Sequence, residues 1–232
     1  NYTTSNVSPN QILSDEIEYV LKAILGAKQE IRDDVGEEID VESAIEYVIN
    51  KNDSRIFNSE EVNVGMSLVI TIDNSASMSG DVDDIALKTC ASIMNAIKDI
   101  KNVELQVHKW SGHTKDDVNI SIANNLEELT RLASPNGGTP LGHGIAYATN
   151  SIMKMKYAQK LMFVLTDGEP NVAYDDSQNA IEFANNQVFN ATQLGVTVFG
   201  LGIGYDMDNN KNMRLIFGDT WQGFNSIENA IK

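Results

Sequence analysis

The stretch "VITIDNSASMSG", Val69 to Gly80, decides the fold, because an apolar run ends there in an acid that serines follow. The apolar run belongs to a strand predicted over Ser67 to Ile72. Asp73, Ser75 and Ser77 come next, and alternate residues of a tight loop can point the same way. The spacing therefore predicts one carboxylate and two hydroxyls at the end of a buried strand.

From Met66 onward, short apolar runs alternate with longer amphipathic ones. This alternation is typical of an α/β fold, with a mostly parallel central sheet and helices on both faces. Strands are expected at Ser67 to Ile72, Glu104 to Lys109, Val118 to Ile122, Leu161 to Thr166 and Val196 to Leu201. Helices are expected at Val82 to Ile100, Leu126 to Leu132, Leu141 to Met155, Ser177 to Leu194, Asn210 to Ile216 and near Ile227. The short connection before the third strand makes it an antiparallel edge strand.

Two other segments should bring polar side chains to the same edge of the sheet. The strand ending at Thr166 is followed by Asp167, and the loop "SPNGGTP" places Thr139 just before a helix. In such a sheet, function gathers at the carboxyl ends of the strands. The predicted metal site consists of Asp73, Ser75, Ser77, Thr139 and Asp167.

These five side chains are hard oxygen ligands, without a thiol or an imidazole. Such a set suits Mg²⁺, or Mn²⁺, and argues against zinc and copper. Mg²⁺ takes about six ligands and keeps water at several of them. A site with so few protein ligands should leave a position open for an Asp or Glu of a partner protein, and the metal would then join two proteins.

The chain has 232 residues, enough for one core of ordinary size with an appendage. Residues 1–63 are predicted to form a helical N-terminal extension, with one helix from about Gln11 to Gly26 and a second over Val41 to Ile49. Residues 64–232 form the predicted α/β domain.

The formal net charge of −16 disfavours nucleic acid and anionic membranes as partners and favours cations or basic protein surfaces. Cys90 is the lone cysteine, sits in a helical pattern and is expected in the core. The chain shows no apolar run of membrane-spanning length and no secretion signal, which leads us to expect a soluble, cytoplasmic protein.

Three motifs carry a resemblance to a known family: "DNSAS", "GGTPLGHGI" and "LTDGEP", in that order and spacing. Together they resemble the metal-ion-dependent adhesion site of von Willebrand factor A domains, over about Val64 to Lys232. The resemblance implies a Rossmann-like fold, direct hydroxyl ligands, and aspartates that act largely through water. Ala76 stands where that family commonly has glycine.

A narrower resemblance involves "IDVESAIEYVINKNDSRIF", "GGTPLGHGIAYA" and "TDGEPN". These segments are similar to the C-terminal part of CobT-type cobaltochelatase subunits and their nitric-oxide-reductase-activator relatives. The resemblance implies a partner, a MoxR-like AAA+ ATPase, and a target protein that the ATPase remodels or loads with metal. The long acidic N-terminal region of that family is not evident in this chain.

The expected function is therefore a non-catalytic subunit that binds a partner carboxylate. The sequence has no phosphate-binding loop with Lys and Ser/Thr, and no serine has a histidine partner at a supporting spacing. One alternative is an extracellular or pilus-type adhesion domain. Another is a metal-dependent hydrolase that uses the same carboxylates.

Several charged residues are expected close to the predicted site. Asp81, Asp83 and Asp84 begin a predicted helix, where acids interact favourably with the helix dipole. Glu169 and His143 follow the two other site segments and are expected at the edge of the site or on the surface.

Overall fold

The computed structural model describes residues 7–15, 17–19, 65–174, 178–204 and 207–224. The second predicted N-terminal helix and the helix predicted near Ile227 lie outside these residues. Within the described part of the chain, no helix is both long enough and apolar enough to cross a bilayer.

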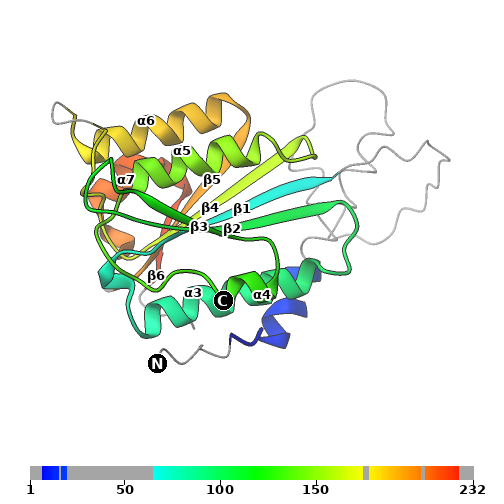
Figure 1. Cartoon of the computed structure of the whole chain (residues 1–232). Coiled ribbons are helices and arrows are strands. Elements are labelled where there is room, and N and C mark those ends of the chain that lie inside the picture. Colours follow the sequence, from blue (N-terminus) through cyan, green and yellow to red (C-terminus); the bar gives the residue numbers. More distant parts are fainter. Residues whose placement is uncertain (1–6, 16, 20–64, 175–177, 205–206, 225–232) are drawn as a thin grey trace, which may run out of the picture.

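In the described residues, a six-stranded sheet forms the centre, in the order β3-β2-β1-β4-β5-β6 (Figure 1). The strands are β1 (Met66–Asp73), β2 (Val103–Ser111), β3 (Asn119–Ala123), β4 (Gln159–Thr166), β5 (Val196–Ile203) and β6 (Trp221–Phe224). All neighbours pair in parallel except β2 and β3. The predicted fold class and its antiparallel edge strand are confirmed.

Strand β1 lies between β2 and β4, and all eight of its residues are buried. Parallel strands in such sheets are covered on both faces, which accounts for the continuous apolar character of β1. In the pairing register, Ile72 lies beside Lys109 of β2 and Leu165 of β4. The carboxyl ends of the three strands therefore meet at one edge.

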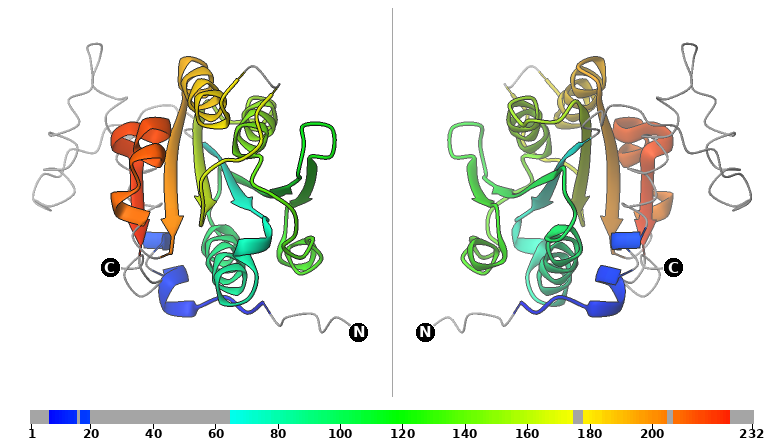
Figure 2. Two further views of the ribbon diagram at one scale, coloured as in Figure 1. Left: turned by 90° about the vertical axis from the view of Figure 1, so that its left-hand side faces the viewer. Right: turned by 90° about the vertical axis from the view of Figure 1, so that its right-hand side faces the viewer.

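Helices cover both faces of the sheet, α5 and α6 on one and α3 and α4 on the other (Figures 1 and 2). The helices are α3 (Asp81–Ile97), α4 (Leu126–Leu129), α5 (Leu141–Ile152), α6 (Ala180–Gln193) and α7 (Lys211–Phe217). Short 3₁₀ turns in the described residues span Ala76–Met78, Met207–Asn209 and Gly218–Thr220.

Helices α3 and α5 end three residues before their predicted ends, at Ile97 and Ile152. In both, the residues that follow form a tighter turn. The N–H of Ile100 donates to the carbonyl of Ile97, and that of Met155 to the carbonyl of Ile152. Such three-residue bonds are common where a helix terminates, and apolar periodicity does not distinguish them from a further α-helical turn.

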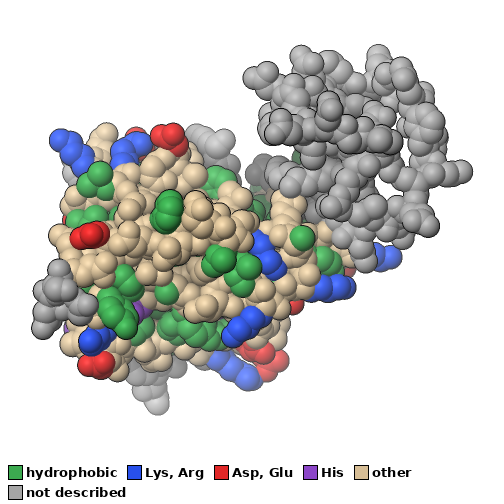
Figure 3. All heavy atoms as spheres, turned by 90° about the horizontal axis from the view of Figure 1, so that it is seen from above, with side chains coloured by type: hydrophobic (Ala, Val, Ile, Leu, Met, Phe, Trp, Pro, Cys, Tyr) green, Lys and Arg blue, Asp and Glu red, His purple; other side chains and the backbone are tan. Residues whose placement is uncertain are grey.

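Each face of the sheet has its own core. Val69, Trp110 and Ile145 belong to the core under α5 and α6, which also includes residues of α7. Ile70 and Cys90 belong to the core under α3. Cys90 is fully buried, as predicted. Hydrophobic side chains on the outer surface of α5 and α6 lie in separate small groups, as is normal for a protein surface (Figure 3).

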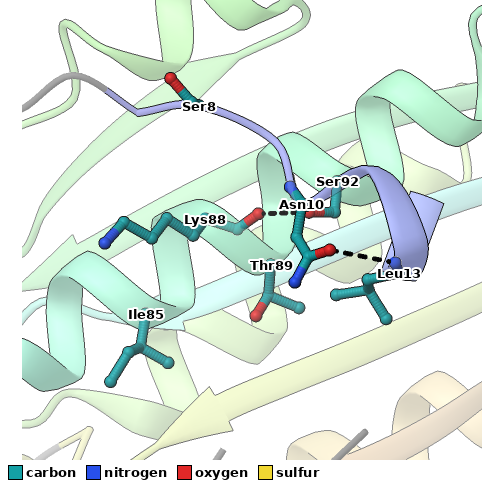
Figure 4. Close-up of a pocket in the computed structure, with 7 residues that line it drawn as sticks. All are labelled: Ser8, Asn10, Leu13, Ile85, Lys88, Thr89 and Ser92. Atoms are coloured by element: carbon teal, nitrogen blue, oxygen red, sulfur yellow. Dashed lines mark hydrogen bonds between the residues drawn. The ribbon is translucent and has the colours of Figure 1, made fainter.

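The N-terminal segment 7–19 packs on the outer side of α3 (Figures 2 and 4). Residues 11–15 and 17–19 are helical, and the helix begins where it was predicted. The N–H of Asn10 donates to Oγ of Ser92 (2.8 Å), and Oγ of Ser14 donates to the carbonyl of Ser92 (3.0 Å). A shallow groove of about 160 Å³ remains between the segment and α3, lined by Ser8, Asn10, Leu13, Ile85, Lys88, Thr89 and Ser92.

Candidate metal centre

The sheet edge brings together the ends of β1 and β4 and the start of α5. Asp73 is the last residue of β1, Asp167 follows β4, and Thr139 lies two residues before α5. Asp73 and Thr139 are buried, whereas Asp167 is half-buried. This is the edge at which the sequence predicts the site.

Both carboxylate oxygens of Asp73 accept hydrogen bonds from the protein. Oδ1 accepts from the backbone N–H of Ser75 (2.8 Å), and Oδ2 accepts from the hydroxyl of Thr166 (2.7 Å). The side chain is completely buried, and this burial raises its pKa to about 7. Desolvation penalises the charged form more than the hydrogen bonds from Thr166 and Ser75 favour it. The carboxylate is therefore fixed in orientation but poorly compensated in charge.

A chain of hydroxyl groups links this loop to Asp167. Oγ of Ser75 lies 3.0 Å from Oγ of Ser77, and Ser77 donates to Oδ1 of Asp167 (2.9 Å). A hydroxyl has one proton, so Ser75 is the donor to Ser77. Burial also raises the pKa of Asp167. Four of the five predicted site residues thus lie in one compact group.

Thr139 joins this group through the backbone of its loop. The N–H of Ala76 donates to the carbonyl of Gly137 (3.1 Å), which holds the loop against the serine turn. Gly137 has a φ of +74°, a conformation that favours glycine. At Gly138, a Cβ atom would lie 2.9 Å from the carbonyl oxygen of Gly112, so the loop can pack this closely only without a side chain.

Sequence reasoning missed one residue that orders this loop, Asn171. The side-chain Oδ1 of Asn171 accepts from the backbone N–H of Thr139 (2.8 Å). The backbone N–H of Asn171 donates to the carbonyl of Thr139 (3.2 Å). The only signal was its position in "TDGEPN", shortly after Asp167.

The remaining residues near the edge make other contacts. Glu169 accepts from the side-chain amide of Asn212 (2.8 Å). The ring of His143 packs edge-on against Phe183, and its two nitrogens have no hydrogen-bond partner in the described structure. Burial lowers the pKa of His143, so the ring favours its neutral form. Both residues remain surface or packing residues.

The side chains at this edge fit a hard divalent cation. Every donor is an oxygen, as a hard cation prefers. The described residues contain no cluster of three or more His, Cys, Asp or Glu side chains that could hold a metal ion, so a metal here would rely on two carboxylates and on hydroxyl oxygens. The pKa of both aspartates is raised because burial leaves their charge uncompensated. A bound cation would favour the charged forms of both groups.

Solved structures with a similar fold include domains of bacterial pilus proteins. For the pilus adhesin SpaC of Lactobacillus rhamnosus GG in its open conformation, the TM-score is 0.57 at 14% identity, over 74% of this chain and 29% of SpaC. The vWF domain of the type V pili tip protein Mfa5 of Porphyromonas gingivalis has a TM-score of 0.55 at 14% identity. The match covers 73% of this chain and 92% of the Mfa5 domain. The PilB minor pilin of Streptococcus sanguinis has a TM-score of 0.52 at 15% identity. The match covers 75% of this chain and 60% of PilB.

The chain therefore spans less than a third of SpaC, and identities this low establish the fold alone. No curated protein matches the chain. The family model of the von Willebrand factor type A domain matches residues 67–229, which is more than half of the chain and includes the sheet except for the first residue of β1. The chain belongs to the von Willebrand factor type A domain family.

Proposed function

We propose that this domain is a non-catalytic protein-binding module whose candidate metal centre holds Mg²⁺, or Mn²⁺, and through it a carboxylate of a partner protein. One observation carries the proposal. The buried carboxylate of Asp73 lies at the same sheet edge as a hydroxyl chain that ends on Asp167. Two carboxylates offset the charge of a divalent cation, and the hydroxyls add neutral oxygen ligands.

The protein residues have distinct roles in this proposal. Ser75, Ser77 and Thr139 would hold the metal directly, and Asp73 and Asp167 largely through water. When bound, the metal supplies an open coordination position for an Asp or Glu of the partner. The hydrogen bonds from Ser75 and Thr166 keep the Asp73 carboxylate in one orientation before binding. Little ordering of the site then accompanies binding.

The comparisons favour adhesion as the setting for this module. The similar domains belong to a pilus adhesin, a pilus tip protein and a minor pilin. They support an extracellular or pilus-type role, in which the partner is a protein on another surface. The second candidate is a CobT-like subunit of a cytoplasmic complex with a MoxR-like AAA+ ATPase. It is supported by the segments "GGTPLGHGIAYA" and "TDGEPN".

Calorimetric titration with Mn²⁺ and Mg²⁺ tests the metal site. We expect one bound ion, and at least tenfold weaker binding in Ser77→Ala. Ser79→Ala is the matched control, because Ser79 is an exposed serine of the same loop that lies outside the hydroxyl chain. Equal affinities for these two variants, or no binding by the native protein, would refute the site.

A second measurement separates the two settings. The native protein is tested for binding to immobilised collagen, fibronectin and fibrinogen, and to a purified MoxR-type ATPase, in Mg²⁺ and in EDTA. Metal-dependent capture by a matrix protein supports the adhesive setting, and metal-dependent capture by the ATPase supports the CobT-like one. Capture that persists unchanged in EDTA contradicts metal-mediated binding in either setting.

A further inference from the structure

A buried lysine lies beneath the start of α3, next to the candidate metal centre. Lys109 is near the end of β2, and only 1% of it is exposed. Its Nζ donates to Oδ1 of Asp83 (2.6 Å) and to the carbonyl of Ala133 (3.0 Å). The two acceptors belong to different segments. Asp83 is in the first turn of α3, and Ala133 is in the connection that leads to Thr139.

Stability does not readily explain this ion pair. Lysine is rarely buried completely, and moving an ammonium and a carboxylate out of water costs more than their attraction often returns. Apolar side chains of similar volume are commonly as stable at such positions. What the pair does contribute is geometry, because a buried ammonium must keep its acceptors within hydrogen-bond distance.

Both segments that Lys109 joins lead directly into proposed ligands. Helix α3 begins just after the turn that carries Ser77, so its first residue limits where that turn can lie. The connection from Ala133 runs to Thr139 through a second set of anchors at Asn74. The side-chain amide of Asn74 donates to the carbonyl of Ser134 (3.1 Å), and the backbone carbonyl of Asn74 accepts from the N–H of Asn136 (2.8 Å).

Asn74 holds the connection against β1, but among these contacts only Lys109 also holds α3. Without Lys109, α3 and the Thr139 connection would still pack on the sheet, each with its own contacts. The bond from the N–H of Ala76 to the carbonyl of Gly137 would still join the serine turn to the loop, but α3 and the connection would no longer share a buried partner.

We propose that Lys109 is a positioning residue that, together with the direct bond between Ala76 and Gly137, fixes the serine turn relative to the Thr139 loop through its bonds to Asp83 and Ala133. This inference rests on the proposed function, because it concerns the geometry of the metal ligands. It assigns a role to a residue outside the ligand set. Lys109 should therefore increase the affinity of the site for metal, although its ammonium is itself a cation and repels the metal ion.

Charge and geometry predict opposite effects when Lys109 is replaced. A cation near a metal site repels the metal, so a purely electrostatic role predicts tighter metal binding in Lys109→Met. A positioning role predicts weaker binding, because the hydroxyl ligands lose their alignment. The direction of the change therefore identifies the role.

The experiment uses three variants of the full chain, Lys109→Met, the double variant Lys109→Met/Asp83→Asn, and Lys88→Met. Mn²⁺ affinity is measured by calorimetry, and thermal unfolding is measured in EDTA. The double variant removes one charge of each sign, so the net charge is unchanged and no buried carboxylate loses its partner. Lys88→Met is the control for loss of a positive charge, since Lys88 is an exposed residue of α3.

We expect about tenfold weaker Mn²⁺ binding in the single and the double Lys109 variants. The double variant should unfold within a few degrees of the native protein, and Lys88→Met should bind Mn²⁺ as the native protein does. Unchanged or tighter Mn²⁺ binding in the double variant would overturn the positioning role. This test holds even if the single variant Lys109→Met fails to fold. A native protein that binds no Mn²⁺ would instead overturn the proposed function, and with it this inference.

Discussion

The hydroxyl of Thr166, the last residue of β4, donates a 2.7 Å hydrogen bond to Oδ2 of Asp73, the last residue of the neighbouring strand β1. The other oxygen of Asp73 accepts from the N–H of Ser75. Two neutral donors thus orient a carboxylate whose pKa burial raises to about 7. In the absence of metal, this buried charge lowers the stability of the folded domain.

Asp73→Asn should stabilise the metal-free protein at neutral pH. An asparagine can keep the bond from Ser75 through Oδ1, and its amide can donate to the hydroxyl of Thr166. That hydroxyl can then donate to the carbonyl of Gly168, which already lies 3.0 Å away. The variant avoids the buried charge, and we expect a gain of about 1–4 kcal/mol in the free energy of unfolding at pH 8.

The pH dependence provides the control for this prediction. An Asp with a raised pKa costs stability as the pH rises from its ordinary value near 3.8 towards 7, so the advantage of the variant should grow from pH 5 to pH 8. Thermal unfolding in EDTA measures this advantage, because each kcal/mol in the free energy of unfolding shifts the Tm by about 2–4 °C. Mg²⁺ should stabilise the native protein more than the variant. A variant less stable than the native protein at pH 8 would show that the charge is already compensated.

Asn171→Ala should weaken Mn²⁺ binding about tenfold, because the N–H of Thr139 loses the side-chain acceptor that helps to hold its loop. The backbone N–H of residue 171 can still donate to the carbonyl of Thr139. Asn171→Asp is the matched variant, since a carboxylate oxygen can accept the same bond from Thr139. Calorimetry should find near-native affinity for Asn171→Asp. If both variants bind Mn²⁺ equally weakly, the amide of Asn171 has a role other than ordering Thr139.

His108 should make the domain sensitive to acid. The residue is completely buried, and burial lowers its pKa from 6.5 to about 4. The ring stays neutral in the folded state and gains a proton on unfolding, so stability should be complete above pH 6.5 and fall towards pH 4. We expect this group to account for a loss of about 2–4 kcal/mol over that range.

Chemical denaturation of the native protein and His108→Gln between pH 7 and pH 4 measures this effect. The variant should lose less stability on acidification, and His113→Gln, at an exposed histidine, should follow the native protein. Parallel curves for His108→Gln and the native protein would mean that the ring is protonated in the folded state.

Ser92→Ala should loosen the N-terminal segment from α3, because the hydroxyl of Ser92 accepts the N–H of Asn10. We expect a loss of about 1 kcal/mol and faster hydrogen exchange of the Asn10 amide. Thr89→Ala, in the same groove, is the control and should leave that amide protected. Unchanged exchange in Ser92→Ala would show that other contacts hold the segment in place.

The sequence by itself determined the α/β class, the five longer strands and the edge at which the polar residues gather. Apolar runs of strand length and amphipathic runs of helix length are local properties, and they place Asp73 and Asp167 at the ends of neighbouring strands. Parallel pairing then brings those ends to one edge, whatever the details of packing. The short strand β6, Trp221–Phe224, was not predicted, because four residues with an internal glycine give no clear alternation.

Only the tertiary structure decided which residues hold the site in place. Lys109 contacts Asp83, Asn171 contacts Thr139, and Thr166 contacts Asp73, each across a gap in sequence that no short motif spans. Lysine is usually a surface residue, and Lys109 is buried only because α3 lies over β2. Local patterns encode which face of a strand is buried, whereas the partner that a buried polar group finds there is set by packing between distant segments.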